Sequence, residues 1–203
     1  MKVTKEFLRE KHACATGYRW FCENCLELGD FEEQIKQLKQ HRYDWTNWLL
    51  VRLMSLEQKR KYAIFAAQQV LDIFEAKYPD DERPRKAIEA AAIVVENNTK
   101  ENRSAAAAAA SAAYTAYADD DSTYAYADAA YTAYAAAAAY DAAAASAYDA
   151  AYDDAADSAY ADDDAADSAY AYDAAADAAA ADSTIKEKII NYGLELIKKD
   201  IKK

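Results

Sequence analysis

The chain has 203 residues and a formal net charge of −12 from 36 acidic and 24 basic side chains, which is enough length for one or two domains. This acidity argues against direct binding of nucleic acid, whose phosphates would be repelled, and favours basic protein partners. With three Cys, no charged and apolar leader and no run of about 18 apolar residues, the composition predicts a cytoplasmic protein without a membrane-spanning segment.

Residues 1–104 have the apolar spacing of ordinary helical proteins, so we expect a helical domain with a Trp-rich core over this range. Its first two helices are expected over 7–13 and 18–28, separated near Gly17 and ended near Gly29. A later helix over 44–54 has enough bulk to form the centre of the core, since it contains Trp45, Trp48, Leu49, Leu53 and Met54.

Two pairs of polar residues in this domain predict where helices begin. Asp30 with Glu33, and Ser55 with Gln58, have the spacing at which the N-cap side chain and the side chain three residues later satisfy free backbone donors. Helices should therefore begin near residues 31 and 56.

The stretch 56–78 has apolar side chains at steps of three and four, which predicts one buried helical face made of Tyr62, Phe65, Ala66, Val70, Ile73 and Phe74. Pro79 should end this helix, because proline cannot continue it. Pro84 suits the first turn of the next helix, whose inner face would carry Ile88, Ala91 or Ala92, and Val95.

Residues 105–182 are written in five letters only: 42 Ala, 16 Asp, 12 Tyr and 8 Ser or Thr. All 24 basic residues and the other 20 acids lie outside this segment, so it carries a charge of −16 and the rest of the chain carries +4. A strongly acidic segment is therefore attached to a mildly basic body. Repeat expansion followed by single-nucleotide changes can also produce this set of five residue types, without selection for a particular surface.

The acidic segment predicts a stack of short antiparallel helices rather than one rod. A rod would bring Asp121 and Asp128 onto the same side as its tyrosines and leave no consistent inner face. The acidic runs 119–121 and 162–164 are unfavourable inside a helix, so we expect them to form turns. Near-copies such as 155–164 and 165–174 suit helices that bury their faces against one another.

The last residues, 183–203, predict an amphipathic helix that packs back on the rest of the chain. Thr184 and Glu187 repeat the capping spacing, and Ile185, Ile189, Tyr192 and Leu196 form an apolar stripe. The overall fold class expected is therefore all-α: a helical bundle, then the acidic stack over 105–182, then this terminal helix.

Residues that could carry chemistry are few. His12, Cys14, Cys22 and Cys25 offer four zinc ligands, but Cys22 and Cys25 lie in an expected helix, so buried thiols beside Trp20 are the favoured interpretation. His12 and His41 have no evident catalytic partner, and no phosphate loop or nucleophile motif occurs. We therefore expect no enzymatic activity, no metal and no cofactor.

Three segments resemble a known family: ACATGYRW at 13–20, YDWTNWLLVRL at 43–53, and the run at 62–91 that ends in RPRKAIEAA. They are similar to the predicted all-helical, Ala-rich immunity proteins of bacterial polymorphic-toxin systems, which have phage-borne relatives. The resemblance implies a non-enzymatic protein that neutralises a toxin or another effector by binding it. In that family the Ala-rich tail commonly carries Arg or mixed charge, whereas here it carries only Asp.

The leading functional hypothesis is an immunity or anti-defence inhibitor that presents carboxylates to the basic cleft of a toxin or nucleic-acid enzyme, as a DNA mimic. Asp121, Asp154, Asp163 and Asp164 are the candidate contact residues because they lie in acidic runs. Folded into a stack, the sixteen carboxylates approach one charge per about 2 Å, close to the roughly 1.7 Å of B-DNA.

The alternative is a protein that sequesters a small molecule or nucleotide signal in a pocket between the Trp-rich helices and the Ala-rich stack. The candidate ligand-binding residues for an anion are Arg19, Arg42, Arg52 and Arg60. A third hypothesis, a structural protein that forms homo-oligomers, applies if the Tyr and Ala faces stay exposed.

Overall fold

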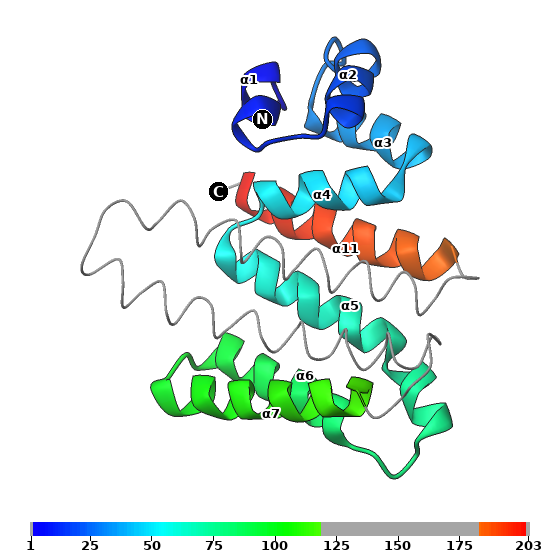
Figure 1. Ribbon diagram of the computed structural model, residues 1–203. Coiled ribbons are helices and arrows are strands. Elements are labelled where there is room, and N and C mark those ends of the chain that lie inside the picture. The colour runs from blue at the N-terminus through cyan, green and yellow to red at the C-terminus, as the bar shows by residue number, and fades with distance from the viewer. Residues whose placement is uncertain (1, 119–182, 202–203) are drawn as a thin grey trace.

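Figure 1 shows the computed structural model of the chain, which describes residues 2–118 and 183–201. All of the regular elements within these ranges are α-helices, as predicted: α1 (Lys5–Glu10), α2 (Ala15–Asn24), α3 (Phe31–His41), α4 (Tyr43–Leu53), α5 (Leu56–Lys77), α6 (Arg83–Glu96), α7 (Lys100–Ala118) and α11 (Ser183–Ile201). The predicted stack of short helices and its turns lie outside the described residues, apart from the part of the segment that α7 contains.

The described helices are stacked in layers, and the C-terminal helix α11 lies in the middle of the stack. In Figure 1, α1, α2 and α3 are at one end and α6 and α7 at the other. Between them, α11 packs along both α4 and α5. None of the described helices is both long enough and apolar enough to cross a lipid bilayer.

The predicted caps of α3 and α5 are confirmed. The backbone amide of Gln58 donates to Ser55 Oγ at 3.3 Å, and the Ser55 amide donates to Gln58 Oε1 at 2.8 Å, which completes the capping box. The Glu33 amide donates to Asp30 Oδ1 at 3.0 Å. The Glu33 carboxylate instead accepts from the Gly29 amide at 2.8 Å, one residue before the position expected.

The first two helices differ from the sequence prediction. Helix α1 begins at Lys5 because the Thr4 side chain accepts from the Phe7 amide, and it ends at Glu10 instead of Ala13. Gly17 does not separate two helices but lies inside α2, which Cys14 caps through its Sγ atom at 3.4 Å from the Gly17 amide. Cysteine is not among the residues that usually cap helices, so the sequence did not indicate that α2 begins after Cys14.

Helix α1 ends in a hydrogen-bond pattern that glycine normally completes. The amide of Ala13 donates to the carbonyl of Leu8 at 2.9 Å and that of His12 to Arg9 at 3.1 Å, which are the two bonds of a Schellman motif. His12 occupies the left-handed position of this motif, with φ of 54°. It is the non-glycine residue with positive φ in the described part of the chain.

Helix α5 separates two hydrophobic clusters and buries two faces, not the single stripe predicted. Its first face, Tyr62, Ala66, Val70 and Phe74, joins the larger cluster with α1 to α4 and α11. Phe65 and Ile73, also predicted there, are partly buried beside it. A second face packs toward α6 and α7, and consists of Ala63, Ile64, Ala67 and Leu71.

The predicted Trp-centred core is also corrected. The residues of α4 that are fully buried are aliphatic or small polar ones, including Leu49, Leu50 and Val51. Trp45 and Trp48 are half-buried at the edge of the larger cluster. Their rings instead line a cavity, described below.

The second cluster is mostly alanine, and it includes the beginning of the acidic segment. In α7, Ala106, Ala110 and Ala113 are buried at steps of four and three. They face α6, whose inner residues are Ala87, Ile88, Ala91 and Val94; Val95, expected there, is only partly buried. Small side chains let these helices approach closely, so the cluster is held by contact of backbones as much as by side-chain area.

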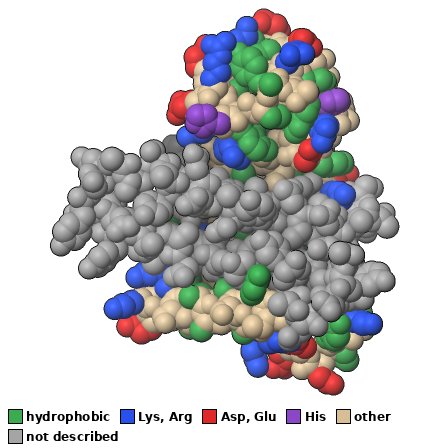
Figure 2. Space-filling model, viewed as in Figure 1, with side chains coloured by type: hydrophobic (Ala, Val, Ile, Leu, Met, Phe, Trp, Pro, Cys, Tyr) green, Lys and Arg blue, Asp and Glu red, His purple; other side chains and the backbone are tan. Residues whose placement is uncertain are grey.

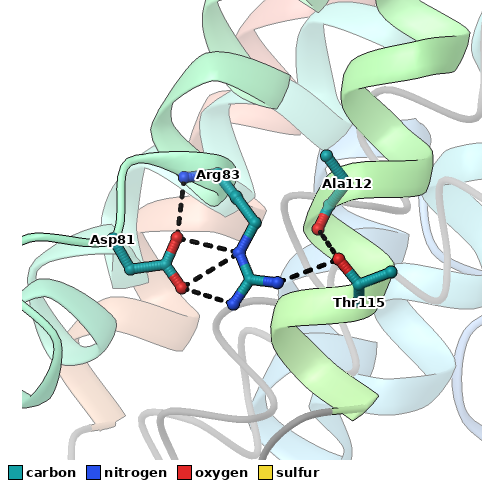
Figure 3. Close-up of polar contacts among 4 residues, drawn as sticks. All are labelled: Asp81, Arg83, Ala112 and Thr115. Carbon is teal, nitrogen blue, oxygen red and sulfur yellow. Dashed lines mark hydrogen bonds and ion pairs between the residues drawn. The ribbon is translucent and has the colours of Figure 1, made fainter.

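A polar joint ties the start of α6 to α7 (Figure 3). The Arg83 guanidinium donates to Asp81 through Nη2 at 2.7 Å and through Nε at 3.0 Å, and its Nη1 donates to Thr115 Oγ1 at 2.9 Å. The Thr115 hydroxyl in turn donates to the Ala112 carbonyl at 2.7 Å. The first turns of the Ala-rich segment are therefore anchored to the body by hydrogen bonds as well as by packing.

Helix α11 is joined to the body by a buried hydrogen bond and by ion pairs at the surface. Gln58 Nε2 donates to the Leu196 carbonyl at 2.7 Å, and Lys39 Nζ pairs with Glu187 at 2.8 Å. Lys198 pairs with Glu32 at 3.2 Å. The helix begins at Ser183, close to the start that the spacing of Thr184 and Glu187 predicts.

Candidate functional site

A cavity of about 320 Å³ opens between the four N-terminal helices. Four buried apolar residues, one from α1, one from α2, one from α3 and one from α4, contribute to its lining: Leu8, Phe21, Leu38 and Leu49. Trp45 and Trp48 of α4 add two indole rings, and the polar lining groups are His12, Cys14, Asp44 and Asn47. The cavity is therefore mainly apolar, with a few polar groups, which is the usual composition of a ligand site.

Local sequence explains why these side chains converge. Asp44, Asn47 and Trp48 are three and four residues apart, so they lie on one face of α4. Gly17 brings α2 close to that face, because a Cβ atom added at Gly17 would lie 3.7 Å from the Trp45 ring and 3.2 Å from Cys14 Sγ. Glycine at this position leaves open the space that a larger side chain would fill.

Asp44 is the charged residue among those that line the cavity, and Arg42 already compensates its charge. Arg42 Nε donates to Asp44 Oδ1 at 2.9 Å and Nη2 donates to Oδ2 at 2.5 Å. Burial alone would raise the pKa of Asp44, but the hydrogen bonds from Arg42 and the backbone of Trp45 outweigh it and lower that pKa. Asp44 is therefore ionised at neutral pH and forms a neutral pair with Arg42.

Each of the two tryptophan rings of the cavity is in contact with an arginine guanidinium. The Arg42 guanidinium carbon lies 4.9 Å from the centroid of Trp45, and that of Arg52 lies 4.3 Å from the centroid of Trp48. Arg52 Nη1 also donates to the Trp48 carbonyl at 3.4 Å. These contacts hold the two rings in place and cover part of their π-surface.

Trp45 also belongs to an aromatic group that extends away from the cavity. Trp20 stacks on His41 with centroids 4.1 Å apart, and Trp45 meets Trp20 at 6.1 Å and His41 at 5.4 Å in tilted arrangements. This group joins α2, the end of α3 and α4. The stacked and tilted ring contacts among Trp20, His41 and Trp45 hold Trp45 in the wall of the cavity.

The arginines expected to bind an anion are not in this cavity. Arg19 is exposed on α2, Arg60 is half-buried on α5, and neither Arg42 nor Arg52 lines the cavity although each contacts one of its tryptophans. The candidate contact residues Asp121, Asp154, Asp163 and Asp164 lie outside the described residues, as does a pocket between the Trp-rich helices and the acidic stack.

The cysteines do not form one buried group. Cys25 is fully buried, as expected, and burial raises the pKa of its thiol to about 11. Cys22 is half-buried, and Cys14 is exposed at the start of α2, contrary to the expectation of buried thiols. Within residues 2–118 and 183–201, no three His, Cys, Asp or Glu side chains come together in a way that could hold a metal ion.

Sequence reasoning named several cavity residues without finding the cavity. The sequence indicates His12 and Cys14 as possible metal ligands and Trp45 and Trp48 as core rings, but not that they line one cavity. Asp44 lies in the first turn of α4, after the N-cap Arg42. The residue that could have indicated the cavity is Gly17 of α2, which lies opposite Asp44 and Trp45 of α4. Its role can be recognised only when α2 and α4 are known to face each other.

Comparison with known protein families gives a match over the part of the chain that forms the cavity. Residues 1–56 match the family model of the YdhT N-terminal domain. No curated protein and no solved structure matches the chain. The matched residues include α1 to α4 and all of the described residues that line the cavity, so this part of the site lies within the segment similar to the YdhT N-terminal domain.

Proposed function

We propose that the protein is a non-enzymatic binding protein, an immunity or anti-defence inhibitor that neutralises a toxin or a nucleic-acid-acting effector. Residues 105–182 would supply the binding surface. The observation that carries this proposal is the separation of charge: sixteen Asp and no Lys or Arg in the segment, against a charge of +4 on the rest of the chain.

The contrast between the two parts of the chain favours the acidic segment as the contact region. On the visible face of the described body, Lys and Arg side chains are interspersed with Asp and Glu (Figure 2). Ion pairs such as Lys39 with Glu187 and Arg85 with Glu75 use some of these charges within the body. The sixteen Asp side chains have no basic neighbour in their own segment, so they create a strong local field that attracts a basic partner.

We propose that this segment folds into a stack of short antiparallel helices that projects its carboxylates outward. Helix α7 supports this arrangement, because its Ala-rich turns bury Ala106, Ala110 and Ala113 against a neighbouring helix. Repetition of the same packing would bring the carboxylates to a density close to that of DNA phosphates. Asp121, Asp154, Asp163 and Asp164 are the proposed contact residues.

The resemblance of residues 13–20, 43–53 and 62–91 to immunity proteins supports the same kind of role. Neutralisation by binding requires no catalytic group, which fits a chain without a recognised catalytic motif. The proposed partner is a basic protein with a nucleic-acid-binding cleft.

Capture from the producing cell tests the proposal. The full chain is immobilised, and proteins bound at about 0.01 M ionic strength are eluted at about 1 M, where screening shortens from about 30 Å to about 3 Å. We expect a basic protein that acts on nucleic acid and whose activity the chain inhibits. Capture of partners that are neutral or acidic and that resist high salt would contradict the electrostatic mechanism.

A further inference from the structure

The cavity between the N-terminal helices has a shape and a chemistry that the acidic segment does not explain. This hollow of about 320 Å³ is partly open to the surface, and its mainly apolar lining with a few polar groups is the usual composition of a small-molecule site. The described residues that line it lie between positions 8 and 49, within the segment similar to the YdhT N-terminal domain.

The described lining favours an uncharged ligand over a charged one. Among the described residues that line the cavity, none is Lys or Arg, so a phosphate or carboxylate would find no such cation there. Both oxygens of Asp44 already accept from Arg42, so an ammonium group would find no uncompensated anion. A charged ligand would lose its hydration without gaining an ion pair.

The walls favour a flat apolar group. Trp45 and Trp48 are held in position by Arg42 and Arg52, so a ligand would meet rings that are already ordered. Aromatic rings prefer offset or edge-to-face contact with such walls. A cavity of about 150 Å³ already accommodates benzene, so this one has room for a ring with a short side chain.

We propose that this cavity binds a small uncharged aromatic compound, with its ring between Trp45, Trp48 and Phe21. The polar groups of His12 and Cys14 set the orientation of a hydroxyl or amide on that compound. This site is independent of the acidic surface, so either can exist without the other.

The chain carries its own reporter for the site. It has three Trp, of which two line the cavity and the third, Trp20, lies 6.1 Å from the Trp45 ring. Titration at pH 7 uses three probes with the same ring and different charge: 2-phenylethanol, 2-phenylethylamine and phenylacetate. Tryptophan emission and the unfolding temperature are both measured, since a ligand that binds only the folded state raises that temperature.

We expect saturable binding of 2-phenylethanol, at least about tenfold tighter than that of either charged probe. N-acetylphenylalanine amide, an uncharged probe with the ring on a peptide unit, distinguishes the source of the ring. Tighter binding of this probe assigns the site to an aromatic side chain of a protein, and tighter binding of 2-phenylethanol assigns it to a free compound. Absence of saturable binding by both uncharged probes, or equal binding of the charged ones, would overturn the proposal.

Two matched variants locate the binding. Ala13 lines the cavity and Ala15 is exposed at the start of α2, so Ala13→Leu fills the hollow while Ala15→Leu adds the same atoms outside it. Ala13→Leu should lower the affinity for 2-phenylethanol about tenfold, and Ala15→Leu should lower it by less than about twofold. Trp48→Leu, which keeps an apolar side chain but removes a ring, provides a second test if Ala13→Leu lowers the helical circular dichroism. Equal binding by the chain and both cavity variants would place the probe elsewhere and contradict the assignment.

Discussion

Gly193 of α11 lies against the ring of Tyr62 of α5 so closely that a Cβ atom added to the glycine would be 2.8 Å from Tyr62 Cε2. Tyr62 is fully buried, and its hydroxyl donates to Asn47 Oδ1 at 3.0 Å. The contact therefore fixes α11 against a ring that is itself fixed to α4. Two residues that are far apart in the sequence thus join α11 to α5.

Gly193→Ala should destabilise the protein, because the ring of Tyr62 has no room to move. Alanine gains about 0.5–1 kcal/mol over glycine inside a helix, but overpacking a buried contact costs about 1–3 kcal/mol. We expect a net loss of about 1 kcal/mol or more in the free energy of unfolding by urea. Gly29→Ala is the control, since its added Cβ would meet mainly the flexible end of Glu33. A Gly193→Ala protein at least as stable as the parent would show that α11 does not approach α5 in this way.

Gln34→Leu should be among the most destabilising substitutions in α3. The Gln34 side chain is fully buried, accepts from the Val3 amide at 2.9 Å and donates to the carbonyls of Val3 at 3.1 Å and Cys25 at 3.2 Å. Leucine leaves these buried backbone groups without their partner, at a cost of about 2–3 kcal/mol.

Gln37→Leu makes the same chemical change on the exposed side of α3 and should alter the free energy of unfolding by less than about 0.5 kcal/mol. Equal effects of the two substitutions, measured by urea unfolding, would contradict the role of Gln34 in holding the N-terminal residues.

His12→Gly should stabilise the fold, because glycine adopts the left-handed conformation of His12 without the steric penalty of a side chain. The expected gain is about 1 kcal/mol, the usual penalty for a non-glycine residue in that region. His12→Ala keeps a Cβ atom and should give no such gain. Thermal unfolding of the two variants measures the difference, and an equal change in both would show that the backbone of residue 12 is not strained.

The joint between Asp81 and Arg83 should make stability depend on acid. Hydrogen bonds from the Arg83 side chain, which outweigh the opposing effect of burial, lower the pKa of Asp81 in the folded protein. Its stabilising contribution is therefore complete above the unfolded value of about 3.9 and is lost as pH falls through the lower folded value. Asp81→Asn should cost about 1 kcal/mol at pH 7 and progressively less as the pH falls below about 3.9.

Asp80→Asn, at the exposed neighbouring position, controls for the general loss of an acid. Urea unfolding between pH 7 and pH 2 measures both variants. A constant difference between Asp81→Asn and the parent over this range would contradict the ion pair.

The sequence predicted helices well where a cap and an apolar period agreed. Ser55 and Gln58 marked the start of α5, Pro79 follows the residue that caps its end, and Pro84 lies in the first turn of α6. It failed at α1 and α2, where a threonine and a cysteine cap the helices and a histidine takes the place of glycine at a helix end. Local patterns alone do not distinguish those positions from their alternatives.

The second buried face of α5 and the cavity were not predicted for a different reason. Ala63 and Ala67 give little hydropathy signal, and their burial depends on α6 and α7 being close enough to cover them. Cavity residues such as Cys14, Gly17 and Trp45 come together only through the packing of α2 against α4. Contacts between helices, rather than properties of one helix, decide both features.

In the proposed mechanism the acidic segment, and not the net charge of the chain, binds the partner. The measurement that tests it compares two variants with the same charge change for affinity to the captured basic protein. One replaces Asp121, Asp154, Asp163 and Asp164 with Asn. The other replaces four exposed acids of the body with Gln: Glu23, Glu27, Glu96 and Glu101.

At low salt the Asp variant should bind at least about tenfold more weakly than the parent, since exposed ion pairs contribute about 0.2–1 kcal/mol each. The Glu variant should lose less than about twofold, and the difference between the two should vanish at about 1 M salt. Equal losses in the two variants, or none in the Asp variant, would contradict the account.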